Sequence, residues 1–226
     1  MASAAAFGLI TALLAVAPAN AAPSSSTTAD AQVASTALDV YNTLDSAADP
    51  QAAYNALSDS DKGAFENYFL PAKTDYTVAV TPLDAAAEEA VSSGVAAATY
   101  SSAQGAAGAM TLASGCWGTY TKATMRSTVG VALWDTFNEG TWCSNGTSVT
   151  SASFGRSWSS IAAVGWRDAG QIGSGSGVSS NQARIWSQRK MIFGTGGWDI
   201  QTMTPCNRLN GSASGGASFS ESCSIY

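Results

Sequence analysis

All four cysteines of this 226-residue chain lie in its second half, at positions 116, 143, 206 and 223. No two of them have the CxxC spacing of a zinc site, so we predict no metal site. Among the three pairings that four cysteines allow, we expect Cys116 with Cys143 and Cys206 with Cys223, because each closes a local loop. The first loop spans about 27 residues, and its closure stabilises the fold by about 3 kcal/mol. The cysteines therefore indicate a cross-linked body in an oxidising compartment.

The segment between the first two cysteines has the two-residue period of a β-strand. Residues 131–138 fall into two alternating sets, as expected for a strand with two distinct faces. Asn138-Glu139-Gly140 predicts a turn, after which residues 141–143 pair back. Ser144-Asn145-Gly146 predicts the next reversal, because Asn and Gly tolerate positive φ. The segment is therefore predicted to be a β-meander.

Further strands are predicted over residues 148–154, 162–169, 181–193 and 198–203. The Gly/Ser clusters at 173–177 and 194–197 separate them and are interpreted as turns. In the longest run, Ala183, Ile185, Ser187, Arg189 and Met191 face one way, and Arg184, Trp186, Gln188, Lys190 and Ile192 face the other. Such spacing is typical of a sandwich or an open barrel, and we favour an antiparallel β-sandwich-like domain over residues 115–226.

The chain begins with an export signal. An apolar run over residues 4–17 leads to Ala19-Asn20-Ala21, a small-x-small site with cleavage expected after Ala21, so residues 1–21 are predicted to be a signal peptide. No Lys or Arg precedes the run, so either the true start lies upstream or the signal is a weak one. No other stretch is apolar enough to span a bilayer, so we expect a secreted, extracellular protein with no membrane span after cleavage.

Residues 22–91 are predicted to form an acidic, mostly helical segment. A helix over about 29–47 is followed by a short one through Leu57, with Asp49 as N-cap and Pro50 as first residue. Ser58 caps a third helix, which Pro71 ends. A possible strand over 74–80 and a helix from Pro82 to Val91 follow, and the Ala/Ser/Gly-rich residues 92–114 are predicted to be a linker. The expected class is thus α+β, a short N-terminal helical segment followed by the disulfide-bonded sandwich.

Charge divides the chain into halves of opposite sign. Residues 22–115 carry 11 acidic and 2 basic side chains, and residues 116–226 carry 5 acidic and 8 basic ones. This contrast suggests that the two halves dock on each other. The basic excess of the second half is small and scattered, and no recognition helix carries it, so nucleic acid is not an expected partner.

The chain contains no histidine. This excludes Ser-His-Asp and Cys-His catalysis and imidazole metal sites as they are normally built. No P-loop is present, and no GxGxxG joins a strand to a helix, so no cofactor is predicted.

Carboxylates are the remaining catalytic candidates, and the sandwich segment carries four, Asp135, Glu139, Asp168 and Asp199. Glycoside hydrolysis needs two carboxyl groups about 5 to 10 Å apart. The alternative interpretation is structural: Glu139 and Asp168 are solvated, and Asp135 or Asp199 pairs with an arginine such as Arg167 or Arg189.

Seven tryptophans make aromatic binding a second possibility. We assign Trp117, Trp134, Trp142 and Trp166 mainly to packing. Trp186 and Trp198 are better candidates for exposure, because Trp186 shares a face with Arg184, Gln188 and Lys190 while Trp198 follows a glycine-rich turn. An aromatic ring flanked by cations and an amide can bind an anionic glycan or polymer. The same face is also a candidate to receive the acidic segment.

Four short motifs carry a resemblance: GCW at Cys116, TWCSNG at Trp142, VGWRDAG at Trp166 and GGWDIQTMTPC before Cys206. They resemble a group of small secreted bacterial proteins of uncharacterised function with a disulfide-stapled β domain. The likeness covers about the last 110 residues and implies secretion and fold. It brings no catalytic residue with it.

The expected function is a non-catalytic extracellular binding or interaction domain, with an extracellular glycan or another envelope protein as partner. The alternative is a hydrolase of an extracellular polymer that uses two of the four carboxylates. A structural or toxin-like envelope protein is a third class.

Overall fold

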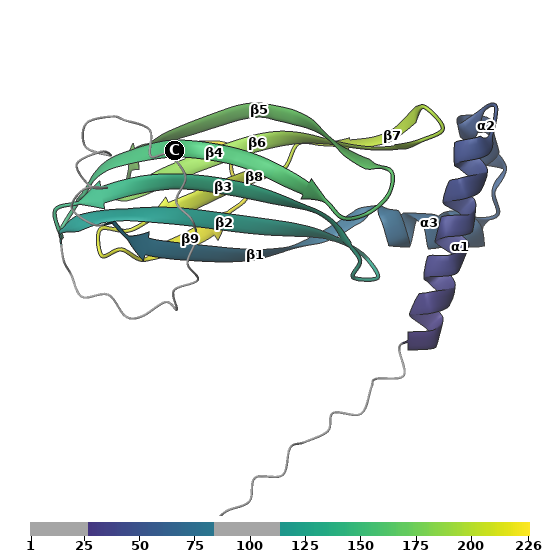
Figure 1. Ribbon diagram of the computed structural model, residues 1–226, viewed down its shortest axis with the longest axis horizontal. Helices are drawn as coiled ribbons and strands as arrows, with labels where there is room; N and C mark the ends of the chain where they lie inside the picture. The colour runs from purple at the N-terminus through teal and green to yellow at the C-terminus, as the bar shows by residue number, and fades with distance from the viewer. Residues whose placement is uncertain (1–26, 84–113) are drawn as a thin grey trace, which may run out of the picture.

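The computed structural model describes residues 27–83 and 114–226. Three helices lie at one end of an elongated sandwich of two antiparallel sheets (Figure 1). The expected α+β class, with a helical segment ahead of a sandwich and two disulfides, is confirmed. The predicted signal peptide 1–21, and nearly all of the predicted helix 82–91 and linker 92–114, lie outside the described residues.

The helices are α1 (Thr27–Ser46), α2 (Pro50–Ala56) and α3 (Asp59–Phe69). Both predicted N-caps are present. The Asp49 carboxylate accepts a hydrogen bond from the Ala52 N–H at 2.9 Å, and the Ser58 hydroxyl accepts one from the Asp61 N–H at 3.1 Å. These bonds satisfy backbone donors that have no partner within the helix, so each short helix starts at a defined residue.

The first sheet has the order β1-β2-β3-β4, from β1 (Pro71–Pro82), β2 (Gly115–Ser127), β3 (Ala132–Ser144) and β4 (Val149–Ile161). The possible strand predicted over 74–80 exists and is longer, and it pairs with β2 from end to end. The sandwich therefore begins at Pro71. The expected domain boundary at residue 115 leaves out one strand of its own sheet.

The turn predicted at Asn138-Glu139-Gly140 is wrong, because β3 continues through these residues. Asn138 is 1% exposed and donates hydrogen bonds to the main-chain oxygens of Ile185 and Asn207 in the opposite sheet. Gly140 lies so close to the neighbouring strand that a Cβ would be 2.6 Å from the Ser153 main-chain oxygen. Both residues are interior contacts, whereas the predicted reversal at Asn145-Gly146 does join β3 to β4.

The second sheet has the order β5-β6-β8-β9, with β7 also paired to β6. Its strands are β5 (Trp166–Ser179), β6 (Gln182–Thr195), β7 (Trp198–Met203), β8 (Cys206–Gly211) and β9 (Ala217–Ser220). The predicted alternation along β6 and the extent of β7 agree with the structure. Two predictions are wrong: residues 162–165 form a turn and not a strand, and the glycine cluster 173–177 lies within β5.

The interior consists of two apolar clusters separated by a polar layer. The cluster at the helical end includes Trp134, Trp166 and Phe193, and the cluster at the far end includes Trp117 and Trp142, so the four tryptophans assigned to packing are buried. Between the clusters, Asn207 Oδ1 accepts a hydrogen bond from Thr121 Oγ1 at 2.7 Å, and Asn207 Nδ2 donates to the Thr136 main-chain oxygen at 3.3 Å. These bonds join the sheets directionally, which opposes sliding of one over the other.

The helices dock on the sandwich through apolar contact. Phe65 and Phe69 pack on Phe193, with ring centroids 5.7 and 5.4 Å apart. Asp45 accepts hydrogen bonds from the Gly196 N–H and the Thr195 hydroxyl. No ion pair joins the helices to the sheets within residues 27–83 and 114–226. The two halves therefore do dock, but among the described residues they do so through apolar contacts and hydrogen bonds and not through ion pairs. Helices α1, α2 and α3 pack at the end of the sandwich near Phe193 and not on the face of Trp186.

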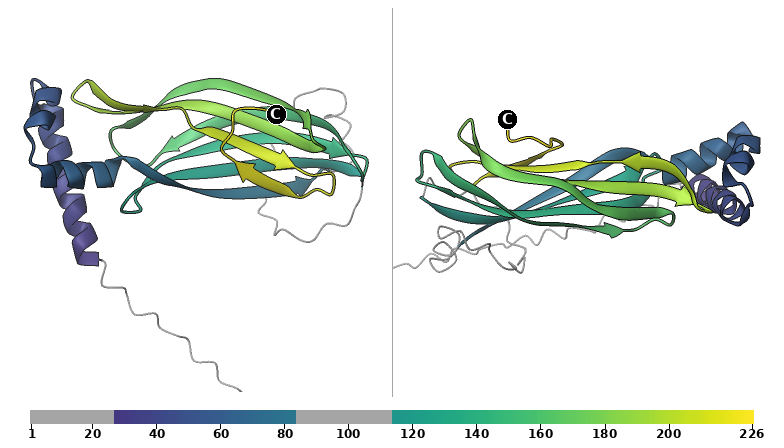
Figure 2. Two further views of the ribbon diagram at one scale, coloured as in Figure 1. Left: turned by 180° about the vertical axis from the view of Figure 1, so that it is seen from behind. Right: turned by 90° about the horizontal axis from the view of Figure 1, so that it is seen from above.

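Disulfides fix two places along the sandwich. Cys116 and Cys143 are cross-strand neighbours on β2 and β3, and Cys206 on β8 is joined to Cys223 in the last residues, the pairing expected from the sequence. The right-hand view of Figure 2 places the chain end outside the sandwich, on the side of the second sheet. None of the helices within the described ranges is long and apolar enough to cross a membrane.

Candidate ligand-binding face

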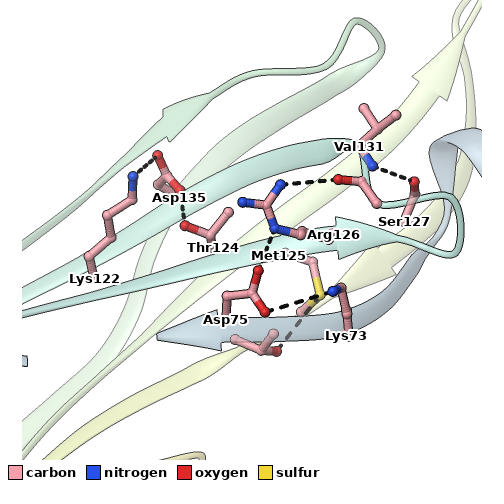
Figure 3. A network of polar contacts seen from close by, with 11 residues as sticks. Lys73, Asp75, Lys122, Thr124, Met125, Arg126, Ser127, Val131 and Asp135 are labelled. Carbon is pink, nitrogen blue, oxygen red and sulfur yellow. Dashed lines mark hydrogen bonds and ion pairs between the residues drawn. The ribbon is translucent and has the colours of Figure 1, made fainter. Parts of the chain in front are cut away.

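Asp135 and Glu139 lie on the outer face of the first sheet, and Figure 3 shows Asp135 with Lys122 and Thr124. Asp135 forms an ion pair with Lys122 at 2.9 Å and accepts a hydrogen bond from the Thr124 hydroxyl at 2.6 Å. The Glu139 carboxylate accepts two hydrogen bonds from Arg156. The hydrogen bonding and the negative charge of Glu139 raise the pKa of the Arg156 guanidinium. The two acids are four residues apart on one strand, about 13 Å between Cα atoms.

The other two carboxylates lie elsewhere. Asp168 lies between the sheets, where it accepts hydrogen bonds from Arg189 and from the Ser159 hydroxyl. Asp199 forms an exposed ion pair with Arg167, one of the pairings that the sequence suggests. Each of the four acids thus has its own cation, and the structure brings no two of them to one site. The geometry gives no support to the hydrolase alternative.

An aromatic cluster accompanies the ion pairs on the outer face of the first sheet. Phe137 and Trp158 stack with centroids 4.9 Å and planes 13° apart, and the Arg156 guanidinium lies 4.5 Å from the Trp158 ring on the same strand. Tyr120 completes the cluster, and burial together with the nearby charges of Asp135 and Glu139 raises its pKa. Because Phe137 and Arg156 already contact the Trp158 ring, this cluster does not offer an open ring face.

Trp186, by contrast, lies flat on its own sheet. A Cβ at Gly173 would be 3.1 Å from Trp186 Cζ3, and one at Gly175 would be 2.7 Å from Nε1. The indole therefore spans both glycines on the outer face of β5, and only residues without a Cβ allow this approach. One ring face rests on the strand, so the opposite face is directed away from the sheet. We call Trp186, Gly173 and Gly175 the Trp186 platform.

Two arginines flank the platform. Arg208 is the cross-strand neighbour of Trp186 on β8, and Arg184 lies two residues before Trp186 on the same face. Burial, and then the charge of Arg184, lower the pKa of Arg208. Gln188 borders the platform on its other side, where its Nε2 donates to the Thr204 main-chain oxygen. The side chains around the indole are thus cationic and amidic donors, which suit an oxygen-rich ligand.

The structure brings together only part of the predicted ligand-binding set, which consists of Trp186, Trp198, Arg184 and Lys190. Lys190 is on the same face of β6, two residues beyond Gln188. Trp198 lies at the helical end, where its ring packs on Tyr54 of α2 with centroids 5.6 Å apart, so it does not belong to this face.

Sequence reasoning missed Arg208 and the two glycines. The spacing of Gly173, Gly175 and Gly177 was the available signal, because every second residue of a strand lies on one face. Because these three glycines lack Cβ atoms on one face of the strand, a flat side chain can lie against the backbone there. The pattern therefore indicates a packing surface and not a turn.

Two other features of the described residues are a surface depression and the distribution of metal-ligating side chains. An open depression of about 730 Å³ lies among the loops at the far end of the sandwich, and its lining, which includes Asn145, Ser180 and Ser212, carries no charged side chain. Within residues 27–83 and 114–226, no three acidic or cysteine side chains come together to hold a metal ion. Neither feature competes with the platform as a ligand site.

Comparison of the chain with protein-family models, with curated proteins and with solved structures finds no match.

Proposed function

We propose that this protein is an extracellular binding domain for a glycan, and that the Trp186 platform is its binding surface. The observation that carries the proposal is the indole lying flat across Gly173 and Gly175. The C–H groups of a sugar ring pack on an aromatic face, and a ring held parallel to the sheet presents such a face without rearrangement. The indole is thus preorganised to pack on one face of a sugar ring.

The groups around the platform support the same class of ligand. Gln188 and the two arginines place N–H donors beside the indole, and sugar hydroxyl oxygens accept such bonds. Small-molecule sites usually combine an apolar or aromatic surface with a few polar groups, and the Trp186 platform with its neighbours has this composition. The two disulfides support an oxidising, extracellular location for this activity.

A glycan array tests the proposal with a matched pair of variants. We expect the wild-type chain to bind a defined group of glycans, and W186A to lose that binding by about tenfold or more. W158A removes a half-buried tryptophan from the outer face of the other sheet and serves as the control, with binding retained. Absence of any glycan binding by the wild type overturns the proposal, and so does loss of binding in W158A with retention in W186A.

A further inference from the structure

We infer that the glycan site selects an acidic sugar chain through the pair Arg184 and Arg208, and that residues 221–226 occupy this pair as a displaceable cover. The inference deepens the proposed function and rests on it for the sugar part of the ligand. The acidic group is an oxyanion, whether carboxylate, sulfate or phosphate, because a guanidinium binds all three through the same paired N–H groups.

Arg184 and Arg208 have no acidic side chain as an ion-pair partner among the described residues. The acids Asp75, Asp135, Glu139, Asp168 and Asp199 each have a basic partner, and those partners do not include Arg184 or Arg208. Within the described part of the chain, no Asp or Glu side chain forms an ion pair with either arginine. The Nε of Arg184 is also buried without an acceptor. Two neighbouring guanidinium groups that no Asp or Glu side chain neutralises favour the arrival of an anion.

Oxygens of residues 222–226 now bind these cations. Arg208 Nη1 donates to the Ser222 hydroxyl at 2.9 Å and to the Ser224 main-chain oxygen at 2.7 Å, and its contact with an oxygen of Tyr226, at 3.5 Å, is longer. Arg184 Nη1 donates to the Ile225 main-chain oxygen at 3.3 Å. An oxyanion adds a charge–charge attraction that a neutral oxygen does not offer, and it can accept two parallel N–H bonds from one guanidinium. An acidic ligand therefore competes with these contacts.

The segment that makes these contacts is lightly held. Residues 221–226 contain no strand or helix, and the Cys206–Cys223 disulfide tethers them to β8. Beyond that disulfide, Ile225 lies over Gly177, where a Cβ would be 3.2 Å from Ile225 Cδ1. Gly177 continues the track of glycines beneath Trp186. The segment thus lies at the end of the same row of glycines on which Trp186 lies.

The experiment compares dextran sulfate with unmodified dextran, which share one backbone and differ in charge. We expect the full-length protein to bind dextran sulfate in a salt-dependent way, and R184Q to weaken this binding by about tenfold. R126Q removes an arginine from the outer face of the other sheet, and its affinity should stay within about twofold of wild type. Equal binding of dextran sulfate by R184Q and wild type overturns the inference.

Two full-length variants test the cover. C206S/C223S removes the tether while Cys116–Cys143 stays, and G177V pushes Ile225 aside with both disulfides intact. Circular dichroism checks that each variant is folded, and G177V alone decides the question if the serine variant is not. We expect tighter binding of dextran sulfate, by about tenfold, in a variant whose cover is displaced. Unchanged affinity overturns the inference.

The outcomes separate this inference from the proposed function. If the array shows no glycan binding, the proposed function fails, although dextran sulfate still reports on the arginine pair. If W186A loses array binding while R184Q binds dextran sulfate as the wild type does, the glycan site stands and its acidic selectivity fails.

Discussion

The indole Nε1 of Trp166 donates a hydrogen bond of 2.9 Å to the main-chain oxygen of Phe69. Trp166 is the first residue of β5 and Phe69 the last of α3, so this bond joins the helices to the second sheet. Both residues are buried, at 5% and 0% exposed.

The first prediction concerns this bond. W166F keeps an aromatic ring but leaves the Phe69 oxygen without its donor, and we expect a loss of about 1–3 kcal/mol in the free energy of unfolding, measured with urea. W158F is the control, because Trp158 is half-buried and phenylalanine keeps an aromatic ring for Phe137 and Arg156 to contact, so its loss should stay below about 1 kcal/mol. Equal losses in the two variants would contradict the role given to the bond.

The second prediction compares a glycine that has no room for a Cβ with one that has ample room. G140A places a Cβ 2.6 Å from the Ser153 main-chain oxygen and 2.9 Å from the Ile185 side chain, and we expect it to destabilise the fold by about 1–3 kcal/mol. G63A lies in α3 with nothing within 4 Å of the new Cβ, so it should stabilise by about 0.5–1 kcal/mol. Thermal unfolding of both variants gives the signs directly, and a stable G140A would show that β3 is not packed as described.

The third prediction is a pH dependence at Asp168. Burial raises the pKa of this carboxyl, but hydrogen bonds from Arg189, Ser159 and the Gly170 N–H outweigh burial, so the folded pKa lies below its ordinary value. A lowered folded pKa stabilises the protein above about pH 4, the unfolded value, and this stabilisation is lost as the pH falls through the folded pKa.

Two variants test this dependence by urea unfolding between pH 7 and pH 2. D168N should cost about 3 kcal/mol at pH 7, because Arg189, whose side chain is 11% exposed, loses its charged partner. The difference from wild type should shrink below pH 4. D199N breaks a pair whose side chains are 51% and 52% exposed, and it should cost less than about 1 kcal/mol at any pH. A pH-independent deficit in D168N would contradict the assignment.

The fourth prediction separates the position of the Trp186 ring from its presence. G175A puts a Cβ 2.7 Å from Trp186 Nε1, so the indole must leave the strand while the rest of the site is kept. We expect glycan binding to fall by about tenfold while the free energy of unfolding changes by less than about 1 kcal/mol. S174A alters the residue directly before Gly175, on the opposite face of β5, and should bind the glycan normally. Full binding by G175A would mean that the flat ring is not the binding surface.

Local patterns were the part of this fold that the sequence could predict. The caps at Asp49 and Ser58, the alternation along β6 and the neighbour pairing of the cysteines each depend on residues close together in the chain. Short-range rules therefore apply to them directly.

The errors arose where a residue serves a distant neighbour. Gly173 and Gly175 have the composition of a turn, but their missing Cβ atoms serve Trp186 on the next strand. Asn138 has the polarity of a turn residue, but its amide reaches Asn207 in the other sheet. Arg208 was missed as a site residue because strand pairing alone places it beside Trp186. Such contacts depend on sheet register, which local propensity does not encode.

The docking of the helices on the β6–β7 hairpin has a consequence for biosynthesis. The bond between Asp45 and the Gly196 N–H joins residues 151 positions apart, and Phe65 and Phe69 pack on Phe193. A nascent chain emerges with its N-terminus first, at about 5–20 residues per second. The helices are therefore made many seconds before the hairpin that covers their aromatic side chains. Until residue 193 has emerged, Phe65 and Phe69 lack the ring on which they pack, so a chain truncated before that residue leaves this apolar surface uncovered.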